Sequence, residues 1–338
     1  MERLTYIDSL KGIGIILVVA GHLFSPYTDY LDDPINQMIY SFHMPLFFFL
    51  SGFVYGHSRK RGAFKRSIVK KFVSLLLPYL CFSALYCFFK NLSWISLLAE
   101  DETHKGYWFT LTLFFVFLIG NLSERVLSNR NSNLEFLFQV LISIVLMAVA
   151  KFELVPNVVS TVFSFDKIAK FYLFYQIGKY VAQGMGWVKM FTNDFVFSLL
   201  LCIYIIVFFK YGFSLDSVNI YSFVLPICGV CVIFNIVQKH DKLISTRGIL
   251  PFLGRKSLEI YLTHLLFLNI LNVNLVRGFD VVYFQILVLL ILSVLVICIS
   301  LGVSFIFCNS ELFSFLLYGK GKYAKGIIDY ICKNDKNV

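Results

Sequence analysis

Residues 7–27 read IDSLKGIGIILVVAGHLFSPY, a stretch long and apolar enough to cross a lipid bilayer as one helix. Of the 338 residues in the whole chain, 58% are hydrophobic and only 15% are charged, and the mean hydropathy is +0.77. Soluble domains average roughly a quarter charged residues. The composition therefore predicts a polytopic membrane protein.

Apolar runs of this kind recur along the chain and leave no room for a separate soluble domain. A membrane-spanning helix needs about 20 apolar residues. We therefore predict an all-α, polytopic membrane helical bundle of about ten transmembrane helices, at residues 7–27, 35–56, 68–90, 107–123, 135–151, 168–184, 193–210, 220–237, 257–276 and 282–308. The expected organisation is one integral membrane domain over residues 1–310, followed by a basic cytoplasmic tail over residues 311–338.

Lysine and arginine are unevenly divided between the two sides of these spans. If the N-terminus is cytoplasmic, 21 of the 30 Lys and Arg residues fall in cytoplasmic segments and 7 in outer segments. Cytoplasmic loops carry such an excess, so both termini are predicted to be cytoplasmic. The same rule accounts for the net charge of +10 without a nucleic-acid partner, and we expect the basic tail to contact membrane lipid.

The first span carries three ionisable residues, Asp8, Lys11 and His22, in an otherwise apolar setting. Such residues are expensive inside a bilayer and mark functional sites by default. Lys11 and His22 are separated by about 16 Å along the helix axis and lie within about 20° of the same face. One face therefore presents a cation near the cytoplasmic side and an imidazole in the outer half of the membrane.

The second span contains the motif SFHMPLFFFLSG at residues 41–52. This span runs in the opposite direction, so His43 is predicted at a depth similar to that of His22 on the neighbouring helix. Pro45 has no N–H to donate and is expected to open the helix near His43, where other polar groups are then needed. The pattern predicts a wet polar pocket; the alternative is that each histidine only hydrogen-bonds to an adjacent helix.

Two cytoplasmic segments carry further charge. The densest run is RKRGAFKRSIVKK at residues 59–71, which includes Arg66, Lys70 and Lys71. Clustered Lys and Arg bind phosphates well, so the run is a candidate docking site for a phosphorylated cytoplasmic ligand; the alternative is topological anchoring, and both can hold. Residues 247–256, RGILPFLGRK, are amphipathic and are predicted to lie on the membrane surface.

The ninth span opens with SLEIYLTH at residues 257–264. Ser257, Tyr261 and His264 fall at positions i, i+4 and i+7, so they form one polar stripe that faces protein or water rather than lipid. At the outer edge of the fourth span, Tyr107-Trp108-Phe109 is typical of an interfacial aromatic belt.

Together these motifs resemble the acyltransferase 3 family of integral membrane acyltransferases. The matching segments are YIDSLKG at residues 6–12 followed by His22, FHMPLFFFLSGF at 42–53, SLLLPY at 74–79, YWF at 107–109 and LGRKSLEIYLTH at 253–264. They occur in family order from residue 3 to about residue 270, and the first two in tandem are the most specific.

The resemblance implies a ten-span domain of the cell (cytoplasmic or inner) membrane that transfers an acyl group, usually acetyl from acetyl-CoA, to a hydroxyl of a cell-envelope or exported glycan. The implied partners are an acyl-CoA and a glycan or lipid-linked saccharide, and no metal is expected. Two departures concern the donor. Many members have Arg where Lys11 stands, and an Arg-x-x-Arg pair is often found where this chain reads Lys71-Phe72-Val73-Ser74.

We expect His22 to act as the general base for the acceptor hydroxyl, since imidazole titrates near working pH. Asp8 is about 21 Å away by helix rise and cannot orient His22, so it is expected to pair with Lys11 instead. Transfer is direct or passes through an acyl-histidine. The other assigned roles are acceptor-side catalysis by His43, binding of CoA phosphates by Lys11, Arg66, Lys70 and Lys71, and support by Trp108, Glu259, Tyr261 and His264.

Two other functions fit parts of the pattern. A transporter or flippase for a glycan or small anion would use the same polar residues as a pathway, without consuming acyl-CoA. A membrane acyltransferase of another family, acting on lipid or protein, would centre on one deep histidine with an asparagine nearby. His264, followed by Asn269, Asn272 and Asn274, is the candidate for that alternative.

Overall fold

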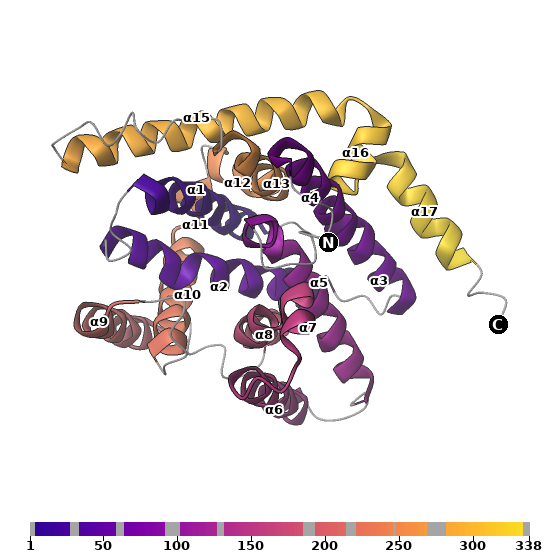
Figure 1. Ribbon diagram of the computed structural model, residues 1–338. Coiled ribbons are helices and arrows are strands. Elements are labelled where there is room, and N and C mark those ends of the chain that lie inside the picture. Colours follow the sequence, from indigo (N-terminus) through magenta and orange to yellow (C-terminus); the bar gives the residue numbers. More distant parts are fainter. Residues whose placement is uncertain are drawn as a thin grey trace. The chain divides into compact units, whose positions relative to one another are not determined.

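The described part of the protein consists of helices joined by short turns and connecting segments (Figure 1). The computed structural model describes residues 4–27, 34–58, 64–91, 102–126, 132–184, 193–213, 221–245, 248–268 and 282–333, and these ranges contain no strand. The helices are α1 (Thr5–Tyr27), α2 (Pro34–His57), α3 (Phe64–Lys71), η1 (Phe72–Leu76), α4 (Leu77–Lys90), α5 (Glu102–Val126), α6 (Ser132–Lys151), α7 (Asn157–Phe163), α8 (Phe165–Ala182), α9 (Asp194–Tyr211), α10 (Tyr221–Lys239), α11 (Asp241–Ser245), α12 (Ile249–Arg255), α13 (Ser257–Leu268), α15 (Val282–Cys308), α16 (Glu311–Tyr318) and α17 (Gly321–Lys333).

Within these ranges, 8 helical segments are long and apolar enough to cross a membrane, with α3, η1 and α4 counted as one. They coincide with eight of the ten predicted spans. The predicted span at 168–184 corresponds to α8, which carries four charged residues, and the span at 257–276 corresponds to α13, whose described part has 12 residues. The prediction of an all-α, multi-pass membrane bundle is confirmed, whereas the number ten and the direction of insertion stay predictions.

The chain forms two compact units. The first unit comprises Met1–Ser58 and Ile177–Gly302, and the second comprises Arg59–Gln176 and Val303–Val338. The core of the first unit joins α1, α2 and α10. Phe49 of α2 meets Phe234 of α10 edge to face with 5.3 Å between ring centroids, and Ile7 of α1 belongs to the same apolar cluster. Aromatic pairs of this kind contribute about 0.5–1.5 kcal/mol beyond their buried area.

In the first unit α12 crosses α1 with their backbones in near contact. A Cβ atom on Gly12 would lie 2.2 Å from the carbonyl oxygen of Leu250, and a Cβ atom on Gly254 would lie 1.8 Å from that of Asp8. Only glycine fits at both positions, because even a methyl group would overlap a backbone atom. The segment predicted to lie on the membrane surface therefore packs one of its faces on α1.

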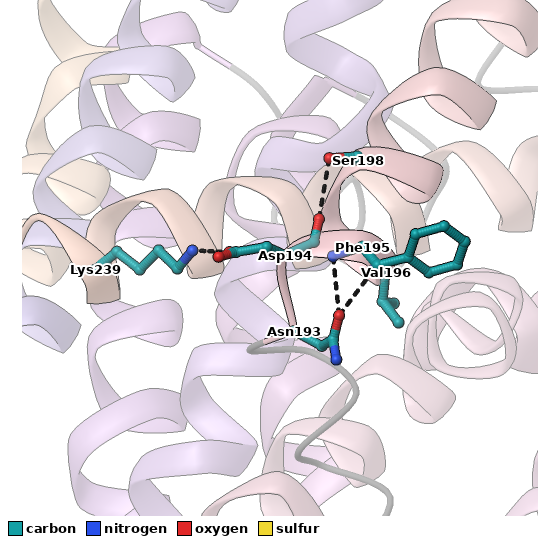
Figure 2. A network of polar contacts seen from close by, with 6 residues as sticks. All are labelled: Asn193, Asp194, Phe195, Val196, Ser198 and Lys239. Carbon is teal, nitrogen blue, oxygen red and sulfur yellow. Dashed lines mark hydrogen bonds and ion pairs between the residues drawn. The ribbon is translucent and has the colours of Figure 1, made fainter.

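Helices α9 and α10 form an antiparallel hairpin that polar contacts close at one end (Figure 2). The side-chain oxygen of Asn193 accepts hydrogen bonds from the N–H groups of Phe195 at 2.9 Å and Val196 at 3.4 Å, and so caps the start of α9. Asp194 follows in the first turn, where a negative charge suits the helix dipole, and pairs with Lys239 at the end of α10.

Contacts at other helix ends of the first unit agree with the predicted order of sides. The hydroxyl of Thr5 donates a hydrogen bond to Asp241 at 3.1 Å, and both residues are predicted to be cytoplasmic. The N–H of Phe213 donates to the side-chain oxygen of Gln37 at 2.9 Å, and both are predicted to lie on the outer side. Such pairs establish which helix ends share a side, and either absolute direction of insertion satisfies them.

In the second unit α3, η1 and α4 follow one another without a break, and the turn at Phe72–Leu76 is π-helical. Pro78 stands just after this turn. It has no N–H to offer the carbonyl of Ser74, and its ring would crowd that carbonyl in a regular α-helix. A wider turn relieves the clash, which accounts for a π-helix at this place.

The predicted basic tail is helical and packs within the second unit. Helix α16 contacts α4, and α17 contacts α16 and α3. Gly319, with φ at +61°, joins α16 to α17, and a Cβ atom there would lie 2.1 Å from the carbonyl oxygen of Val73. Nη2 of Arg66 donates to Asp329 of α17 at 2.6 Å. The domain boundary at residue 310 stays a prediction.

Candidate functional site

The candidate site lies in the first unit, where α1 meets α13. The imidazole rings of His22 and His264 have centroids 5.4 Å apart and planes inclined at 46°. The two rings therefore lie next to each other at the contact of α1 with α13. His264 has no exposed surface, and His22 is partly exposed. The sequence paired His22 with His43 and gave His264 only a supporting role, so this neighbour of His22 was missed.

The backbone of α13 orients the ring of His264. Its Nδ1 lies 2.6 Å from the carbonyl oxygen of Tyr261 and 3.1 Å from that of Ile260. A carbonyl only accepts hydrogen bonds, so Nδ1 carries the proton and, in the neutral ring, Nε2 keeps the lone pair. Nε2 is buried and has no hydrogen-bond partner among the described residues. His264 thus presents an unused acceptor inside the first unit.

His43 is oriented in the same way on α2. Its Nδ1 lies 2.7 Å from the carbonyl oxygen of Ile39, so Nδ1 donates and Nε2 keeps the lone pair. The ring of Tyr40 stands edge-on to His43 with 5.0 Å between centroids. A Cβ atom on Gly21 would lie 3.4 Å from the Tyr40 ring. The position next to His22 therefore packs against the tyrosine that His43 touches, at the contact of α1 with α2.

Helix α2 continues through Pro45, from Pro34 to His57. The predicted opening of the helix is thus limited to the hydrogen bond that Pro45 cannot donate to the carbonyl of Ser41. The side chain of Ser41 supplies polar contacts at this level: its hydroxyl donates to the carbonyl of Met38 at 2.7 Å and lies 2.8 Å from the hydroxyl of Tyr204 on α9. These contacts satisfy the Ser41 hydroxyl, and the wet polar pocket near His43 stays a prediction.

At the other end of α1, two distant motifs come together. Asp8 is buried and Lys11 half-buried, and the backbone of Gly254 rests directly on that of Asp8. Nζ of Lys256 then pairs with Oε1 of Glu259 at 3.2 Å, and the side chain of Glu259 has no exposed surface. The crossing of α1 and α12 thus joins the motifs at residues 6–12 and 253–264. A pair of Asp8 with Lys11 stays a prediction.

Three of the cations predicted to bind phosphates, Arg66, Lys70 and Lys71, lie on α3 in the second unit. No group of three His, Cys, Asp or Glu side chains in the described ranges is placed to hold a metal ion. In the second unit Lys70 is exposed, Lys71 is half-buried with Nζ 5.5 Å from the ring centre of Phe117, and Arg66 is exposed and paired with Asp329. The pairing of Arg66 with the tail was not predicted.

Trp108 lies within the packing of the second unit. Its ring stacks on that of Phe171 with 5.4 Å between centroids, and Nζ of Lys167 stands 4.8 Å from the ring centre. Tyr107 beside it has no exposed surface. These two aromatic residues therefore make protein contacts beyond those of the interfacial belt that the sequence suggested. The asparagines proposed to follow His264, Asn269, Asn272 and Asn274, lie outside the described residues.

One further buried cation, Lys179, lies within a predicted span and was given no role by its sequence pattern. Lys179 of α8 has no exposed surface, and its Nζ lies 4.5 Å from the ring centre of Tyr180. The available signal was a lysine inside a predicted span, which is rare without a role.

Two curated nodulation proteins, both called NolL, are similar to this chain. The protein of Mesorhizobium japonicum is 29% identical over 194 residues, which cover 53% of this chain and 48% of the relative. The protein of Sinorhizobium fredii is 33% identical over 128 residues, which cover 34% of this chain and 35% of the relative. The aligned part thus spans about half or less of each relative. No solved structure matches the chain.

The comparison with protein families covers nearly the whole chain. Residues 4–308 match the family described as the acyltransferase domain, Acyl_transf_3. The match includes every motif on which the resemblance rested, together with α1, α2, α12 and α13, which hold the candidate site. The chain therefore belongs to the acyltransferase 3 family of membrane acyltransferases, as its motifs predicted.

Proposed function

We propose that the protein is an O-acyltransferase of the cytoplasmic or inner membrane, which moves an acetyl group from acetyl-CoA to a hydroxyl of an envelope or exported glycan. Family membership supplies acyl transfer. The observation that carries the proposal is the pair of imidazoles on α1 and α13, His22 and His264, which lie in contact inside an apolar helical unit. An acyl transfer to a hydroxyl needs a base, and imidazole is suited to that role near neutral pH.

In the proposed reaction His22 takes the proton of the acceptor hydroxyl while the hydroxyl oxygen attacks the thioester carbonyl of acetyl-CoA. The new C–O bond forms and the C–S bond to CoA breaks. The proton then passes from His22 to the leaving sulfur, so the enzyme ends as it began. General-base catalysis of this kind contributes about 10²–10⁴-fold to the rate.

His43 suits the acceptor side of the same reaction. Because its Nδ1–H is held by the carbonyl of Ile39, its Nε2 remains an acceptor for a saccharide hydroxyl. The Tyr40 ring links this position to the packing around Gly21, next to His22. We therefore assign His43 to catalysis on the acceptor, with His22 as the base.

Cations suit the donor side. Lys11 lies on the same helix as His22, about 16 Å away by helix rise, so it is proposed to hold the phosphates while the acyl end of CoA extends along α1. In the second unit, α3 carries Arg66, Lys70 and Lys71, and clustered cations of this kind bind phosphates well. Lys in place of Arg at position 11 keeps the positive charge but cannot make the bidentate hydrogen bonds that an Arg guanidinium makes to a phosphate.

Mass analysis of surface polysaccharide tests the proposal in cells. Deletion of the gene should remove acetyl groups from one glycan, and the wild-type gene should restore them. The His22→Ala gene, expressed at the same protein level, should not restore them. Acetylation that persists in the His22→Ala strain contradicts the proposed role of His22.

A transporter or flippase is the competing outcome. It predicts movement of a glycan or anion across vesicles that contain the purified protein, with acetyl-CoA intact. The proposed acyltransferase instead releases free CoA thiol when acetyl-CoA and an acceptor saccharide are both present. Release of thiol that depends on the acceptor therefore separates the two functions.

A further inference from the structure

We propose that His264 is the positioning residue for His22: Nε2 of His264 accepts a hydrogen bond from the His22 nitrogen that faces it. The other nitrogen of His22 is then left without a proton and points to the acceptor hydroxyl. The inference rests on the proposed function, since it assigns a partner to the base of that reaction. It is carried by the contact of the two rings and by the unused, buried Nε2 of His264.

A histidine that acts as a base needs a group to hold its ring and its tautomer, and in many hydrolases a carboxylate does this. The described part of the first unit offers His22 no carboxylate for this purpose. Its acidic residues, Asp8, Asp194, Asp241 and Glu259, all stand in the first turns of their helices, at ends predicted to be cytoplasmic. His22 is in the last third of α1, near the opposite end.

His264 has the chemistry that the role requires. The carbonyl oxygens of Tyr261 and Ile260 hold its Nδ1–H, so the ring cannot turn to offer a donor to His22 without losing these contacts. Nε2 can then only accept. A buried acceptor without a partner costs free energy, and a hydrogen bond from His22 removes that cost. The two rings therefore satisfy each other in one arrangement.

The arrangement also stabilises the charge that forms during the reaction. When His22 takes the proton of the acceptor hydroxyl it becomes an imidazolium, whose other N–H points at the neutral Nε2 of His264. Hydrogen bonds from charged donors are shorter and roughly twice as strong as neutral ones. His264 keeps its own proton on Nδ1 throughout, and the proton on His22 leaves with the CoA sulfur.

Two substitutions of similar size separate this role from simple packing. His264→Leu removes the acceptor, whereas His264→Gln carries an amide oxygen to about the place of Nε2. With purified protein in lipid nanodiscs, we expect His264→Leu to lower kcat at least about tenfold. The KM values for acetyl-CoA and for the acceptor saccharide should stay unchanged, because the substitution misaligns the base and leaves substrate binding intact. His264→Gln should recover most of the loss. His240→Leu, at an exposed position, should behave as wild type.

The inference is overturned if His264→Leu keeps kcat within about twofold of wild type, or if His264→Gln is no better than His264→Leu. Should His264→Leu fail to fold by size-exclusion chromatography, His264→Asn replaces it, because the shorter amide cannot reach the position of Nε2. Failure of the proposed function is distinguishable. In that case the wild-type protein transfers no acyl group, whereas failure of this inference alone leaves wild type active and His22→Ala inactive.

Discussion

His22 of α1 and His264 of α13 lie with their rings 5.4 Å apart, although they come from the first and the ninth predicted spans. The contact depends on α12, which crosses α1 at Gly12 and Gly254 and leads directly into α13. Two motifs that are far apart in the sequence thereby share one helix neighbourhood. The candidate site residues on α1 and α13 are thus held together by a backbone crossing that tolerates only glycine.

That crossing leads to a prediction about stability. Gly254→Ala places a Cβ atom 1.8 Å from the carbonyl oxygen of Asp8, and a backbone atom cannot move aside as a side chain can. Overpacking of this kind costs about 1–3 kcal/mol, so thermal unfolding in detergent should shift to lower temperature. Gly302→Ala in α15 is the control, because its Cβ meets no atom within 4 Å. Equal stability of the two variants would show that α12 does not press on α1 in this way.

The buried carboxylate of Glu259 leads to a second prediction. Lys256→Met removes the cation 3.2 Å from Glu259 Oε1, and a buried charge that loses a partner costs about 1–3 kcal/mol or more. Unfolding by heat should show this loss, and the double variant with Glu259→Gln should recover part of it. The exposed pair of Lys239 with Asp194 is the control, since Lys239→Met should cost less than about 1 kcal/mol. Additive losses in the double variant would contradict the pairing.

The ion pair between α3 and the tail leads to a third prediction, about donor binding. Asp329 neutralises part of the charge of Arg66, and exposed pairs are worth only about 0–1 kcal/mol, so Asp329→Asn should leave stability unchanged. It should lower KM for acetyl-CoA by about two- to fivefold, the effect of freeing one cation for the phosphates. Arg66→Gln should raise that KM, and the double variant should match Arg66→Gln. A KM that rises in Asp329→Asn would mean that the tail helps the donor bind.

Most of the fold was predictable because membrane spans can be recognised in a sequence by their length and hydropathy. The spans at 7–27 and 35–56 correspond closely to α1 and α2. The contact between His22 and His264 was not predictable in this way. Helix periodicity shows which face His264 occupies, and it does not show which helix that face meets, because apolar surfaces that face lipid and protein look alike.

Two further contacts were not predictable for the same physical reason. The segment 247–256 is amphipathic, a pattern that suits either a membrane surface or a groove beside another helix. The glycines at its crossing with α1, Gly12 and Gly254, do not show in the sequence which helix they contact. The aromatic run at residues 107–109 is typical of an interfacial belt, and its composition does not show that Tyr107 is fully buried or that Trp108 stacks on Phe171. Local composition gives the polarity of a site, and only the packing gives its neighbours.

Transfer of labelled acetyl from acetyl-CoA to an acceptor saccharide, by purified protein in nanodiscs, tests the central claim most directly. The account predicts that wild type forms acetylated saccharide and releases an equal amount of CoA. His22→Ala should lower kcat by about 10²–10⁴-fold at unchanged KM for acetyl-CoA, since only the base is lost. His240→Ala, at an exposed position, should match wild type. Full activity of His22→Ala, with the protein folded, would contradict the account.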